Sequence, residues 1–445
     1  MKTLDIIDIG NNCEGIAKEN GKVYFVPKTL VGEKVCAKVI KEKSNFCNCK
    51  LAEVKSPSVG RVIPKCEYFD ICGGCQLQHT SYENQLKIKK QTTQNTISKI
   101  SKLNITLESV LPSNQEFGYR NKMVFAINKD GKICMHDIEG NLFEVKRCLI
   151  TTDNINKIVT LAQKYIDDYK LQSFDKKVAK TYLRYLVIRE LDNKFLITFV
   201  ISNDNTKPLI KFAEVLKNND IIFGLFANVN SKNGSLILTE KFIHIDGLKH
   251  ITSEYKTQSG KAIKYPISPA SFMQVNSYIK DQIYAFVEDK LKGFKFVVDA
   301  YSGAGLLTAI ISQNVEQVVG IEVVKQASKD ADRLKQDNNI NNMKNINADC
   351  VVGLDKVQYK GKSEDFAIVL DPPRKGADQL VLQKVILAKP GKIIYISCNP
   401  ATLARDLSVL AKFYEIESVR AFDMFANTAE IETVVTLNIR GEKWK

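Results

Sequence analysis

The sequence predicts an α/β protein whose C-terminal part is a parallel β-sheet covered by helices on both faces. Three observations indicate this fold class. From residue 265 onward, short apolar segments alternate with segments of helical periodicity, which is the pattern of a parallel sheet with helical connections. The length of 445 residues suits about three domains. No apolar run approaches the ~18–20 residues that a membrane-spanning helix needs.

The first 60 residues are expected to form a small β-module. Short strands at this spacing suit an OB-like barrel, a common platform for nucleic acids, although a purely structural module fits the same pattern. The expected strands lie near Lys22–Pro27, Glu33–Ile40 and Lys50–Val54. The expected turns lie at Asn20-Gly21, Val31-Gly32 and Lys43–Asn48.

Residues 61–264 are expected to form a central α+β domain. A cysteine-rich connector occupies residues 61–80, and mixed helical and strand patterns follow. Apolar residues recur at helical spacing in Ile155–Tyr169, and a shorter helix is expected at Pro208–Leu216. The expected strands are Tyr185–Val187, Phe195–Ile201 and Leu236–Leu238.

Residues 265–445 are expected to form the domain with the parallel sheet. The expected strands are Phe296–Val298, Val318–Ile321, Phe366–Leu370 and Lys392–Ser397. The expected helices are Tyr278–Leu291, Leu306–Ile311, Gln326–Asn338, Gln379–Leu387 and Leu403–Leu410. Ligands of such sheets bind at the carboxyl ends of the strands, so the loops after these strands are the first place to look for a site.

A glycine loop follows the first of these strands. In VVDAYSGAGLLTAII (297–311), Gly303 and Gly305 allow a tight turn and a close approach to a ligand. Glu322 ends the next strand, where a carboxylate can accept hydrogen bonds from ribose hydroxyls. The third glycine that helps to carry a pyrophosphate is missing. The loop therefore favours a nucleoside ligand without a diphosphate, such as S-adenosylmethionine, over a dinucleotide; a turn that only packs is the structural alternative.

Two further loops place reactive groups at strand ends. Asp371 opens DPPR (371–374) directly after the strand Phe366–Leu370, and Cys398 follows the strand Lys392–Ser397 in SCNP (397–400). A thiol beside a helix N-terminus is expected to have its thiolate form stabilised. Most buried cysteines are apolar fillers, but the position of Cys398 at the ligand-binding edge favours a nucleophile.

These motifs together resemble the S-adenosylmethionine-dependent RNA uracil-5-methyltransferases. The resembling motifs, in chain order, are FGYRNKM (117–123), FMQVN (272–276), YSGAG (301–305), IE (321–322), DPPR and SCNP. The segment VYFVPKTLVGEKV (23–35) is similar to the family's N-terminal TRAM domain. The resemblance implies a Rossmann-like methyltransferase domain at 265–445, a TRAM-like barrel at 1–60 that binds RNA, and a central α+β domain between them.

The resemblance also implies a reaction mechanism. The Cys398 thiolate adds to carbon 6 of uracil, carbon 5 accepts the methyl group, and a carboxylate then removes the carbon-5 proton before the thiol leaves. The sequence FANTAEIETV (425–434) puts Glu432 at the base position of the family and Glu430 where the family usually has histidine. Both carboxylates would lie on one face of a strand, so their spacing does not separate them; Glu432 is the favoured base.

By the same resemblance, five residues are expected to contact S-adenosylmethionine. Tyr301 would pack beside the ligand and Glu322 would hold the ribose. Asp349, in NADC (347–350), would contact the adenine. The full set of expected cofactor contacts is Gln274, Tyr301, Glu322, Asp349 and Asp371.

The eleven cysteines suggest a metal site in addition to the nucleophile. Cys66, Cys72 and Cys75 form C-x5-C-x2-C, a spacing that suits either zinc or an iron–sulfur cluster. The resemblance selects Cys148 as the fourth ligand and implies a [4Fe-4S] cluster, with zinc as the alternative. Cys47 and Cys49 are interpreted as residues of a polar loop without a metal.

The charge of the chain suits a phosphate-rich partner or simply a solvated, lysine-rich surface, and the motifs above make RNA the expected partner. Lys and Arg number 64 against 50 Asp and Glu, a net charge of +14, which draws a protein to phosphate backbones. Arg120 and Lys122 are the candidate RNA contacts of the central domain. The TRAM-like segment and the cysteine motif resemble the ribosomal branch of the family, so 23S rRNA is the expected substrate, with tRNA as the alternative.

Other functions fit parts of the pattern. The DPPR loop alone also suits a methyltransferase of amino groups, and the cysteine motif suits a non-catalytic RNA-binding factor. The early acidic residues Asp5 and Asp8 do not fit a signal peptide. The sequence therefore predicts a monomeric, cytoplasmic enzyme that does not bind membranes.

Overall fold

The computed structural model describes all residues except 172–173, 176–179, 233, 235, 360 and 442–445. The chain divides into two compact units. One unit combines the N-terminal segment Met1–Glu116 with the C-terminal segment Leu370–Lys445, and the other is Phe117–Val369. In the described residues no helix is both long and apolar enough to cross a membrane.

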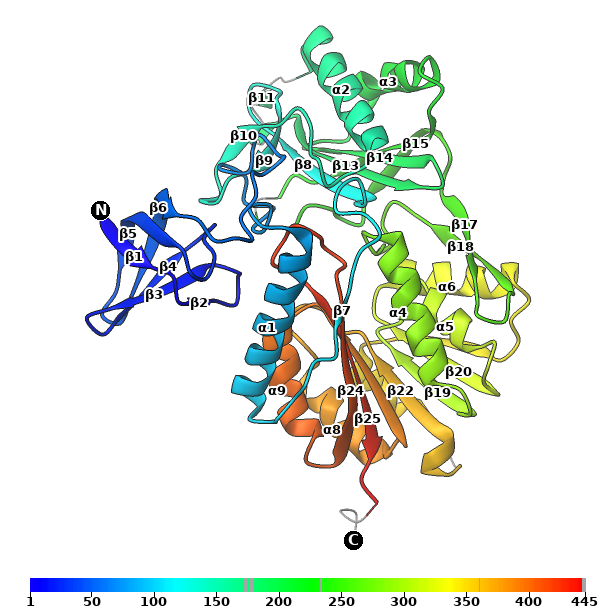
Figure 1. Cartoon of the computed structure of the whole chain (residues 1–445). Coiled ribbons are helices and arrows are strands. Elements are labelled where there is room, and N and C mark those ends of the chain that lie inside the picture. The colour runs from blue at the N-terminus through cyan, green and yellow to red at the C-terminus, as the bar shows by residue number, and fades with distance from the viewer. Residues whose placement is uncertain (172–173, 176–179, 233, 235, 360, 442–445) are drawn as a thin grey trace. The chain divides into compact units, whose positions relative to one another are not determined.

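The first unit begins with a six-stranded, all-β sheet in the order β1-β5-β6-β4-β3-β2 (Figure 1). Its strands are β1 (Lys2–Asp5), β2 (Asp8–Ile9), β3 (Gly15–Glu19), β4 (Lys22–Val26), β5 (Lys34–Glu42) and β6 (Phe46–Ser56). The expected β-module is confirmed. The turn expected at Lys43–Asn48 is shorter, because β6 already begins at Phe46. The interpretation of Cys47 and Cys49 as loop residues is wrong, since both lie in β6 and are buried in the core of this sheet.

The rest of the first unit is built from both ends of the chain. Its strands are β7 (Val110–Leu111), β23 (Lys392–Ser397), β24 (Tyr414–Phe422) and β25 (Glu432–Ile439), in the order β23-β25-β24-β7. Its helices are α1 (Tyr82–Ser101), α8 (Gln379–Ala388) and α9 (Pro400–Leu410). Helix α1 packs against α9, so residues separated by some 300 positions in the sequence lie side by side (Figure 1).

The second unit contains a seven-stranded sheet in the order β10-β9-β8-β13-β14-β15-β16. Its strands are β8 (Lys122–Ile127), β9 (Ile133–His136), β10 (Leu142–Glu144), β13 (Leu183–Leu191), β14 (Lys194–Ile201), β15 (Ile222–Val229) and β16 (Phe242–Gly247). Two short strands, β11 (Phe174–Asp175) and β12 (Lys180–Thr181), pair separately. Helices α2 (Asp153–Asp168) and α3 (Lys207–Lys217) confirm the two helices expected here.

One strand expected in this region is absent. Leu236–Leu238 forms no strand. The buried Asn230 side chain takes the place of a strand partner, because its Nδ2 donates to the carbonyl oxygens of Leu236, at 2.7 Å, and Ile237, at 2.9 Å. The apolar residues that suggested a strand therefore lie in a loop held by a side-chain amide.

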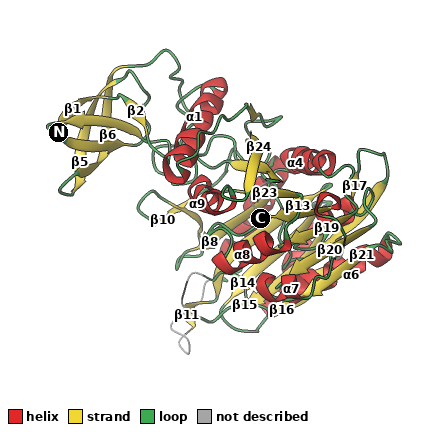
Figure 2. Ribbon diagram, turned by 90° about the horizontal axis from the view of Figure 1, so that it is seen from below, coloured by secondary structure: helices red, strands yellow, loops and turns green. Residues whose placement is uncertain are grey.

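The second unit also contains the glycine loop and a group of strands with the order β21-β20-β19-β22. These are β19 (Phe296–Ala300), β20 (Gln317–Glu322), β21 (Met343–Asn347) and β22 (Phe366–Leu370), which ends at the boundary of the unit. The helices between them are α5 (Leu306–Ile311), α6 (Lys325–Asp337), α7 (Cys350–Asp355) and the short η1 (Ser363–Asp365). Helices α6 and α7 lie against the parallel strands (Figure 2). The hairpin β17 (Ile251–Lys256) and β18 (Ala262–Ile267) and helix α4 (Ser277–Lys290) precede them.

Candidate active site

Cys398 lies at the carboxyl end of a strand and immediately before a helix. It follows β23 and precedes α9, whose first turn is capped by Asn399: the Oδ1 of Asn399 accepts from the backbone N–H of Ala401 at 3.0 Å. The thiol is partly buried. This is the position that the sequence predicted for Cys398.

The pairing of two strands brings Cys398 and Glu432 to the same end of a ladder. Strands β23 and β25 are antiparallel, and Ser397 pairs with Thr433 at the last position of the ladder. Cys398 directly follows this pair on one strand, and Glu432, the first residue of β25, directly precedes it on the other. The carboxylate of Glu432 is close enough to raise the pKa of the Cys398 thiol. The structure thus places the predicted nucleophile and the predicted base side by side.

Glu430 occupies a different environment. It precedes β25, so the expectation that Glu430 and Glu432 share one face of a strand is wrong. Glu430 is partly exposed and forms an ion pair with Arg374, with 2.9 Å between the Nη2 of Arg374 and the Oε2 of Glu430. Glu432 is 4% exposed. Burial therefore distinguishes the two carboxylates, whereas their spacing in the sequence did not.

The charges around Glu432 favour its protonated form. Burial raises the pKa of the Glu432 carboxyl well above its usual range, and the carboxylates of Asp371 and Glu430 raise it further. Arg374 acts in the opposite direction. A carboxyl group with a raised pKa is a stronger base once it is ionised, which is the property that a general base requires.

The same groups act on the thiol. Burial, followed by the carboxylate of Glu432, raises the pKa of Cys398 to about 12, and Arg374 lowers it. The expectation that the helix N-terminus stabilises the thiolate is wrong for the free protein, because desolvation and the neighbouring carboxylates outweigh the favourable dipole. Cys398 is accordingly a protonated thiol at neutral pH in this structure.

Helix α9 holds the DPPR loop in place. The side chains of Asn399 and Thr402 donate to the carbonyl oxygen of Arg374 at 3.1 and 3.2 Å. The segment that carries the nucleophile and the loop that carries Asp371 and Arg374 are thus joined by direct hydrogen bonds.

Asp406 fixes the end of this loop, and the sequence analysis missed it. Its carboxylate is fully buried and accepts from the backbone N–H of Ala377 at 2.9 Å and from the hydroxyl of Tyr395 at 2.5 Å. Gly376, with a φ of 79°, passes close to it, since a Cβ there would lie 2.7 Å from the Oδ2 of Asp406. Asp406 lies on the apolar side of a helical pattern in the sequence, and this unusual position could have identified it.

The glycine loop of the second unit is held by Glu322. The Oε2 of Glu322 accepts from the N–H of Gly303 at 2.9 Å, and its Oε1 accepts from the N–H of Val324 at 2.6 Å. Tyr301 adopts a φ of 76°, which is uncommon for a residue other than glycine. Such backbone conformations concentrate at ligand-binding sites. Tyr301, Gly303 and Glu322 therefore form one structured loop at the ends of β19 and β20.

The other expected cofactor residues lie in this unit and at the start of the DPPR loop. Asp349 follows β21 and caps α7, accepting from the N–H of Val351 at 2.9 Å. Gln274 is partly buried in the loop between β18 and α4. Ser271 of that loop donates to the buried Asp330 of α6 at 2.8 Å. Asp371, in the first unit, follows β22 directly.

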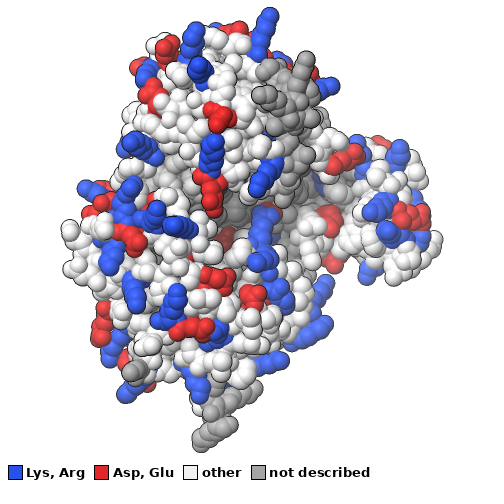
Figure 3. All heavy atoms as spheres, turned by 180° about the vertical axis from the view of Figure 1, so that it is seen from behind, with Lys and Arg blue, Asp and Glu red and all other residues white. Residues whose placement is uncertain are grey.

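Three basic residues gather in the second unit. The Nε of Arg120 donates to the carbonyl oxygen of Lys122 at 3.1 Å, and the Lys122 ammonium lies 5.9 Å from the centre of the exposed Phe272 ring. Burial, with the nearby charges of Arg189 and Arg120, lowers the pKa of Lys122 to about 8. On the face that Figure 3 shows, Lys and Arg are spread out and interspersed with acidic residues.

The cysteine motif does not form a metal centre among the described residues, because no group of three or more His, Cys, Asp or Glu side chains is placed to hold a metal ion. The three predicted ligands Cys66, Cys72 and Cys75 are partly buried, and the N–H of Gly74 donates to the sulfur of Cys72 at 3.3 Å. Cys148 belongs to the second unit, where Asn156 binds its backbone N–H and carbonyl.

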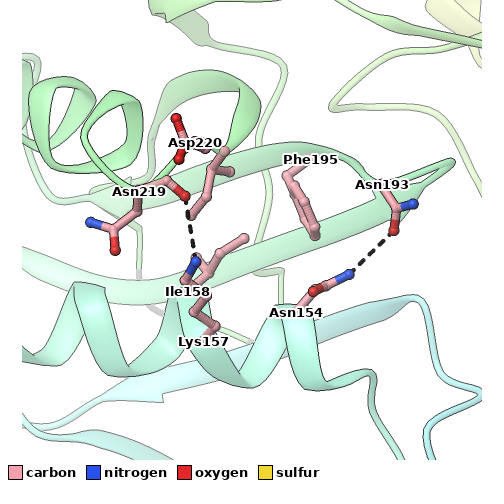
Figure 4. A pocket seen from close by; sticks show the side chains of 8 residues that line it. Asn154, Lys157, Ile158, Asn193, Phe195, Asn219 and Asp220 are labelled. Atoms are coloured by element: carbon pink, nitrogen blue, oxygen red, sulfur yellow. Dashed lines mark hydrogen bonds between the residues drawn. The ribbon is translucent and has the colours of Figure 1, made fainter.

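The second unit also contains a pocket that the predicted site residues do not line. It has a volume of about 180 Å3 and lies where the start of α2 meets the β13–β14 hairpin and the turn after α3 (Figure 4). None of its lining residues is a predicted site residue; they are Asn154, Lys157, Ile158, Asn193, Phe195, Asn219, Asp220 and Ile221.

Comparisons with known proteins show what the chain is similar to. Residues 81–440 match the family model described as tRNA (uracil-5-)-methyltransferase. An uncharacterized RNA methyltransferase of Clostridium tetani is 32% identical over 99% of this chain and 97% of its own. Another from Staphylococcus aureus is 30% identical, over 99% and 98%. The crystal structure of Pyrococcus abyssi tRNA (uracil-54, C5)-methyltransferase with S-adenosyl-L-homocysteine is similar over 98% of this chain and 99% of that one, with a TM-score of 0.78 and 25% identity.

Proposed function

The chain belongs to the family of S-adenosylmethionine-dependent RNA (uracil-5-)-methyltransferases, and from this we propose that it methylates a uridine of a structured RNA through a covalent adduct between Cys398 and carbon 6. The observation that carries the proposal is the pairing of β23 with β25, which brings Cys398 and Glu432 to the same end of the ladder. A nucleophile and a base on adjacent strands match the two roles that this chemistry requires.

The reaction balances with these two side chains in their ionised forms, once the thiol proton of Cys398 and the carboxyl proton of Glu432 have passed to solvent. The Cys398 thiolate forms a bond to carbon 6 of uracil, and the electron pair of the 5,6 double bond becomes available at carbon 5. Carbon 5 takes the methyl group from the sulfonium, which S-adenosylmethionine supplies, and S-adenosylhomocysteine leaves. Glu432 then removes the carbon-5 proton, the 5,6 double bond forms again, and the sulfur–carbon bond breaks to return the Cys398 thiolate.

The electrostatics give Glu432 the base role in preference to Glu430. Glu432 is buried and has a raised pKa, whereas Glu430 is partly exposed and paired with Arg374. A buried carboxylate accepts a proton from carbon more readily than a solvated, ion-paired one. In this proposal, Glu430 holds Arg374 near the site and does not itself take the proton.

The expected cofactor contacts are part of the proposal. Glu322, which already organises the glycine loop, and Tyr301 beside it would bind the nucleoside of S-adenosylmethionine. Asp349 would contact the adenine, and Gln274 and Asp371 would contact the remainder of the ligand. The left-handed backbone at Tyr301 and Gly303 supports a loop shaped around a ligand.

The RNA target has two candidates. The resemblance to the ribosomal branch favours 23S rRNA, and the proposed domains are a TRAM-like barrel at 1–60, a central domain at 61–264 and a methyltransferase domain at 265–445. The match to a tRNA (uracil-54, C5)-methyltransferase includes nearly the whole chain, N-terminal module included, and favours tRNA as the second candidate. Arg120 and Lys122 are the proposed RNA contacts of the central domain.

The resemblance supplies a second part of the proposal, a [4Fe-4S] cluster. Its ligands would be Cys66, Cys72, Cys75 and Cys148, and zinc is the alternative metal. The described residues do not fit the group, because no three or more of their His, Cys, Asp or Glu side chains are placed to hold a metal ion. No step of methyl transfer depends on it. Iron, sulfide and zinc analysis of protein purified without oxygen tests this site, and a metal content unchanged by Cys72→Ser rejects it.

Mapping 5-methyluridine in 23S rRNA and in tRNA, with and without the protein, tests the function and identifies the target. Cys398→Ala is expected to abolish methylation of whichever RNA responds. Glu432→Gln is expected to accumulate a protein–RNA adduct that survives denaturing electrophoresis, because methyl transfer is complete but the proton is not removed. Full methylation by Cys398→Ala contradicts the proposal.

A further inference from the structure

The loop that leads into Glu432 is bound by residues from the N-terminal part of the same unit. This loop, Asp423–Ile431, joins β24 to β25 and is called the base loop below. It has no regular secondary structure of its own. Its conformation therefore depends on the side chains that hold it, and they come from α1 and from the cysteine segment that precedes α1.

Asn427 lies at the centre of these contacts. It is 1% exposed and adopts a φ of 69°, a left-handed conformation that asparagine tolerates better than most residues. Gln85 of α1 binds it reciprocally: the Oε1 of Gln85 accepts from the N–H of Asn427 at 3.0 Å, and its Nε2 donates to the Oδ1 of Asn427 at 3.1 Å. The Nδ2 of Asn427 donates to the carbonyl oxygen of Glu116 at 2.6 Å.

The cysteine segment binds the other side of the same residue. The backbone N–H groups of Gln76 and Leu77 donate to the carbonyl oxygen of Asn427 at 3.1 and 3.0 Å. The side chain of Gln76 accepts from the N–H of Ala429 at 3.0 Å and donates to the carbonyl oxygen of Gly73 at 2.8 Å. Gln76 thus connects the turn between Cys72 and Cys75 to a point three residues before Glu432.

The start of the base loop is fixed by a buried charge pair. The Nζ of Lys89 donates to the Oδ1 of Asp423 at 2.6 Å and to the carbonyl oxygen of Phe425 at 3.0 Å, and both charged side chains are fully buried. The hydroxyl of Tyr82 donates to the Oδ2 of Asp423 at 2.7 Å. With Asp423 and Asn427 both held, the loop has little freedom to move before β25 begins.

We propose that Gln76, Gln85 and Asn427 are positioning residues that hold Glu432 near Cys398. The proposal rests on the proposed function, because it assigns a purpose to the position of the base. The polar atoms of the Asn427 side chain and main chain bind within the protein, so this residue acts through the loop and has no group directed at the substrate. The cysteine segment in this reading supports the active site through Gln76.

This role predicts a specific kinetic defect. When the base is displaced, addition of Cys398 and methyl transfer continue, but removal of the carbon-5 proton slows. The covalent adduct then accumulates, as it does for Glu432→Gln, while the affinity for S-adenosylmethionine is unchanged. A residue that only stabilises the fold would lower the amount of active protein, with no accumulation of the adduct.

The experiment compares Gln85→Ala with Gln91→Ala in the full-length protein. Both glutamines lie on α1, but Gln91 is exposed and binds only Asn95 of the same helix among the hydrogen bonds described for it. Gln85→Ala is expected to lower kcat about tenfold to a hundredfold, as displacements of this kind do, with the KM for RNA unchanged and adduct on a denaturing gel. Gln91→Ala is expected to behave as the wild type in all three measurements.

Two further variants keep the test decisive if Gln85→Ala folds poorly. Asn427→Gly preserves the left-handed backbone and removes the side-chain bonds, and Gln76→Ala removes the bond to Ala429 while its main-chain donation remains. Both variants are expected to accumulate adduct. The loss of kcat in the double variant Gln85→Ala with Asn427→Gly is expected to be smaller than the sum of the two single losses, because the two side chains share one contact.

The outcomes separate this inference from the proposed function. If the wild type methylates RNA and Glu432→Gln accumulates adduct, the proposed function stands. If the folded Gln76, Gln85 and Asn427 variants then match Gln91→Ala in kcat and adduct, the positioning role is overturned. If no adduct forms even with Glu432→Gln, the proposed function itself fails.

Discussion

Cys398 is held as a thiol by burial and by the carboxylate of Glu432, the proposed base. Burial and Glu432 raise its pKa to about 12, and Arg374 is the cation that opposes them. An unactivated thiol protects the free enzyme from oxidation and alkylation, since the thiolate is the reactive form. The nucleophile therefore depends on the arrival of its substrates for activation.

The reactivity of Cys398 in the free protein tests this state. Below a pKa of about 12, the thiolate fraction rises tenfold for each pH unit, so alkylation of Cys398 by iodoacetamide is expected to rise about tenfold per unit from pH 7 to pH 9. Mass spectrometry of the peptide that contains Cys398 measures this rate apart from those of the other cysteines. Arg374→Ala is expected to slow the reaction by removing the cation, and a rate that levels off below pH 9 contradicts the raised pKa.

At the scale of single residues, the motifs predicted which groups react, which stays a prediction, and missed the protonation state of the thiol. Cys398 and Glu432 were predicted from motifs, and the register of β23 and β25 brings them together. The raised pKa of Cys398 was missed because it depends on burial and on the nearby carboxylate of Glu432, and the spacing of residues in the sequence reveals neither. The location of Glu430 outside β25 was missed because strand ends are the least predictable part of an element.

Among the elements, helix α1 illustrates what periodicity does not detect. Its buried face is largely polar and includes Gln85, Lys89, Thr92 and Thr93, so the apolar stripe that identifies a helix is missing. By contrast, Leu306–Ile311 and Phe366–Leu370 match their predictions residue for residue, because both are apolar segments bounded by clear turn signals. A helix such as α1, which packs through polar contacts with distant segments, is therefore not predicted from the pattern of apolar residues.

The buried pair of Lys89 and Asp423 is expected to dominate the stability of α1 against its neighbours. Lys89→Met leaves the Asp423 carboxylate buried without its cation, which costs about 3–5 kcal/mol in such pairs. Lys87→Met removes a surface pair with Glu83 on the same helix and is expected to cost far less, because solvent screens exposed charges. Urea unfolding of both variants measures the difference, and equal losses would show that the buried pair is not special.

The two glycines of the cofactor loop are expected to differ in purpose. A Cβ on Gly305 would lie 2.7 Å from the Cβ of Ala331 in α6, so Gly305→Ala is expected to destabilise the protein through overpacking, by about 1–3 kcal/mol, in addition to the strain of its left-handed φ of 81°. A Cβ on Gly303 would meet no atom within 4 Å. Gly303→Ala is expected to cost only the left-handed strain, about 1 kcal/mol, and to weaken binding of S-adenosylmethionine because the loop approaches the ligand there.

Thermal unfolding and calorimetric titration with S-adenosylmethionine separate these two effects. The pair of results expected is a lower Tm for Gly305→Ala and a weaker Kd for Gly303→Ala with a nearly unchanged Tm. If Gly303→Ala binds S-adenosylmethionine as tightly as the wild type, the loop is a packing turn and not a ligand cradle.

In the whole molecule, the unit that contains Cys398 and Glu432 is assembled from both ends of the chain. Residues 1–116 and 370–445 form one compact unit, and Gln76 and Gln85 bind the base loop more than 300 positions away. The sequence predicted strands, helices and motifs in their order along the chain. It did not predict this assembly, because hydrogen bonds between distant segments leave no periodic pattern in either segment.

The net charge of +14 was the first indication of an RNA partner, and its contribution can be tested through salt. Each phosphate neutralised by a Lys or Arg steepens the dependence of log K on log salt by about 0.7–0.9. Lys122→Met is expected to weaken RNA binding at pH 7 and to reduce this slope by about 1. Lys292→Met, which removes a surface lysine paired with Asp289, is expected to leave the slope unchanged.

The lowered pKa of Lys122, about 8, adds a pH dependence with a definite sign. Below pH 8 the ammonium is charged and can bind a phosphate, which would raise its pKa further; above that value the free protein loses the charge, so binding weakens as the pH rises. The difference between the wild type and Lys122→Met is therefore expected to be largest near pH 7 and to shrink by pH 10. Fluorescence anisotropy with a labelled RNA at several salt concentrations measures it, and a difference that does not change with pH places the phosphate contact on another residue.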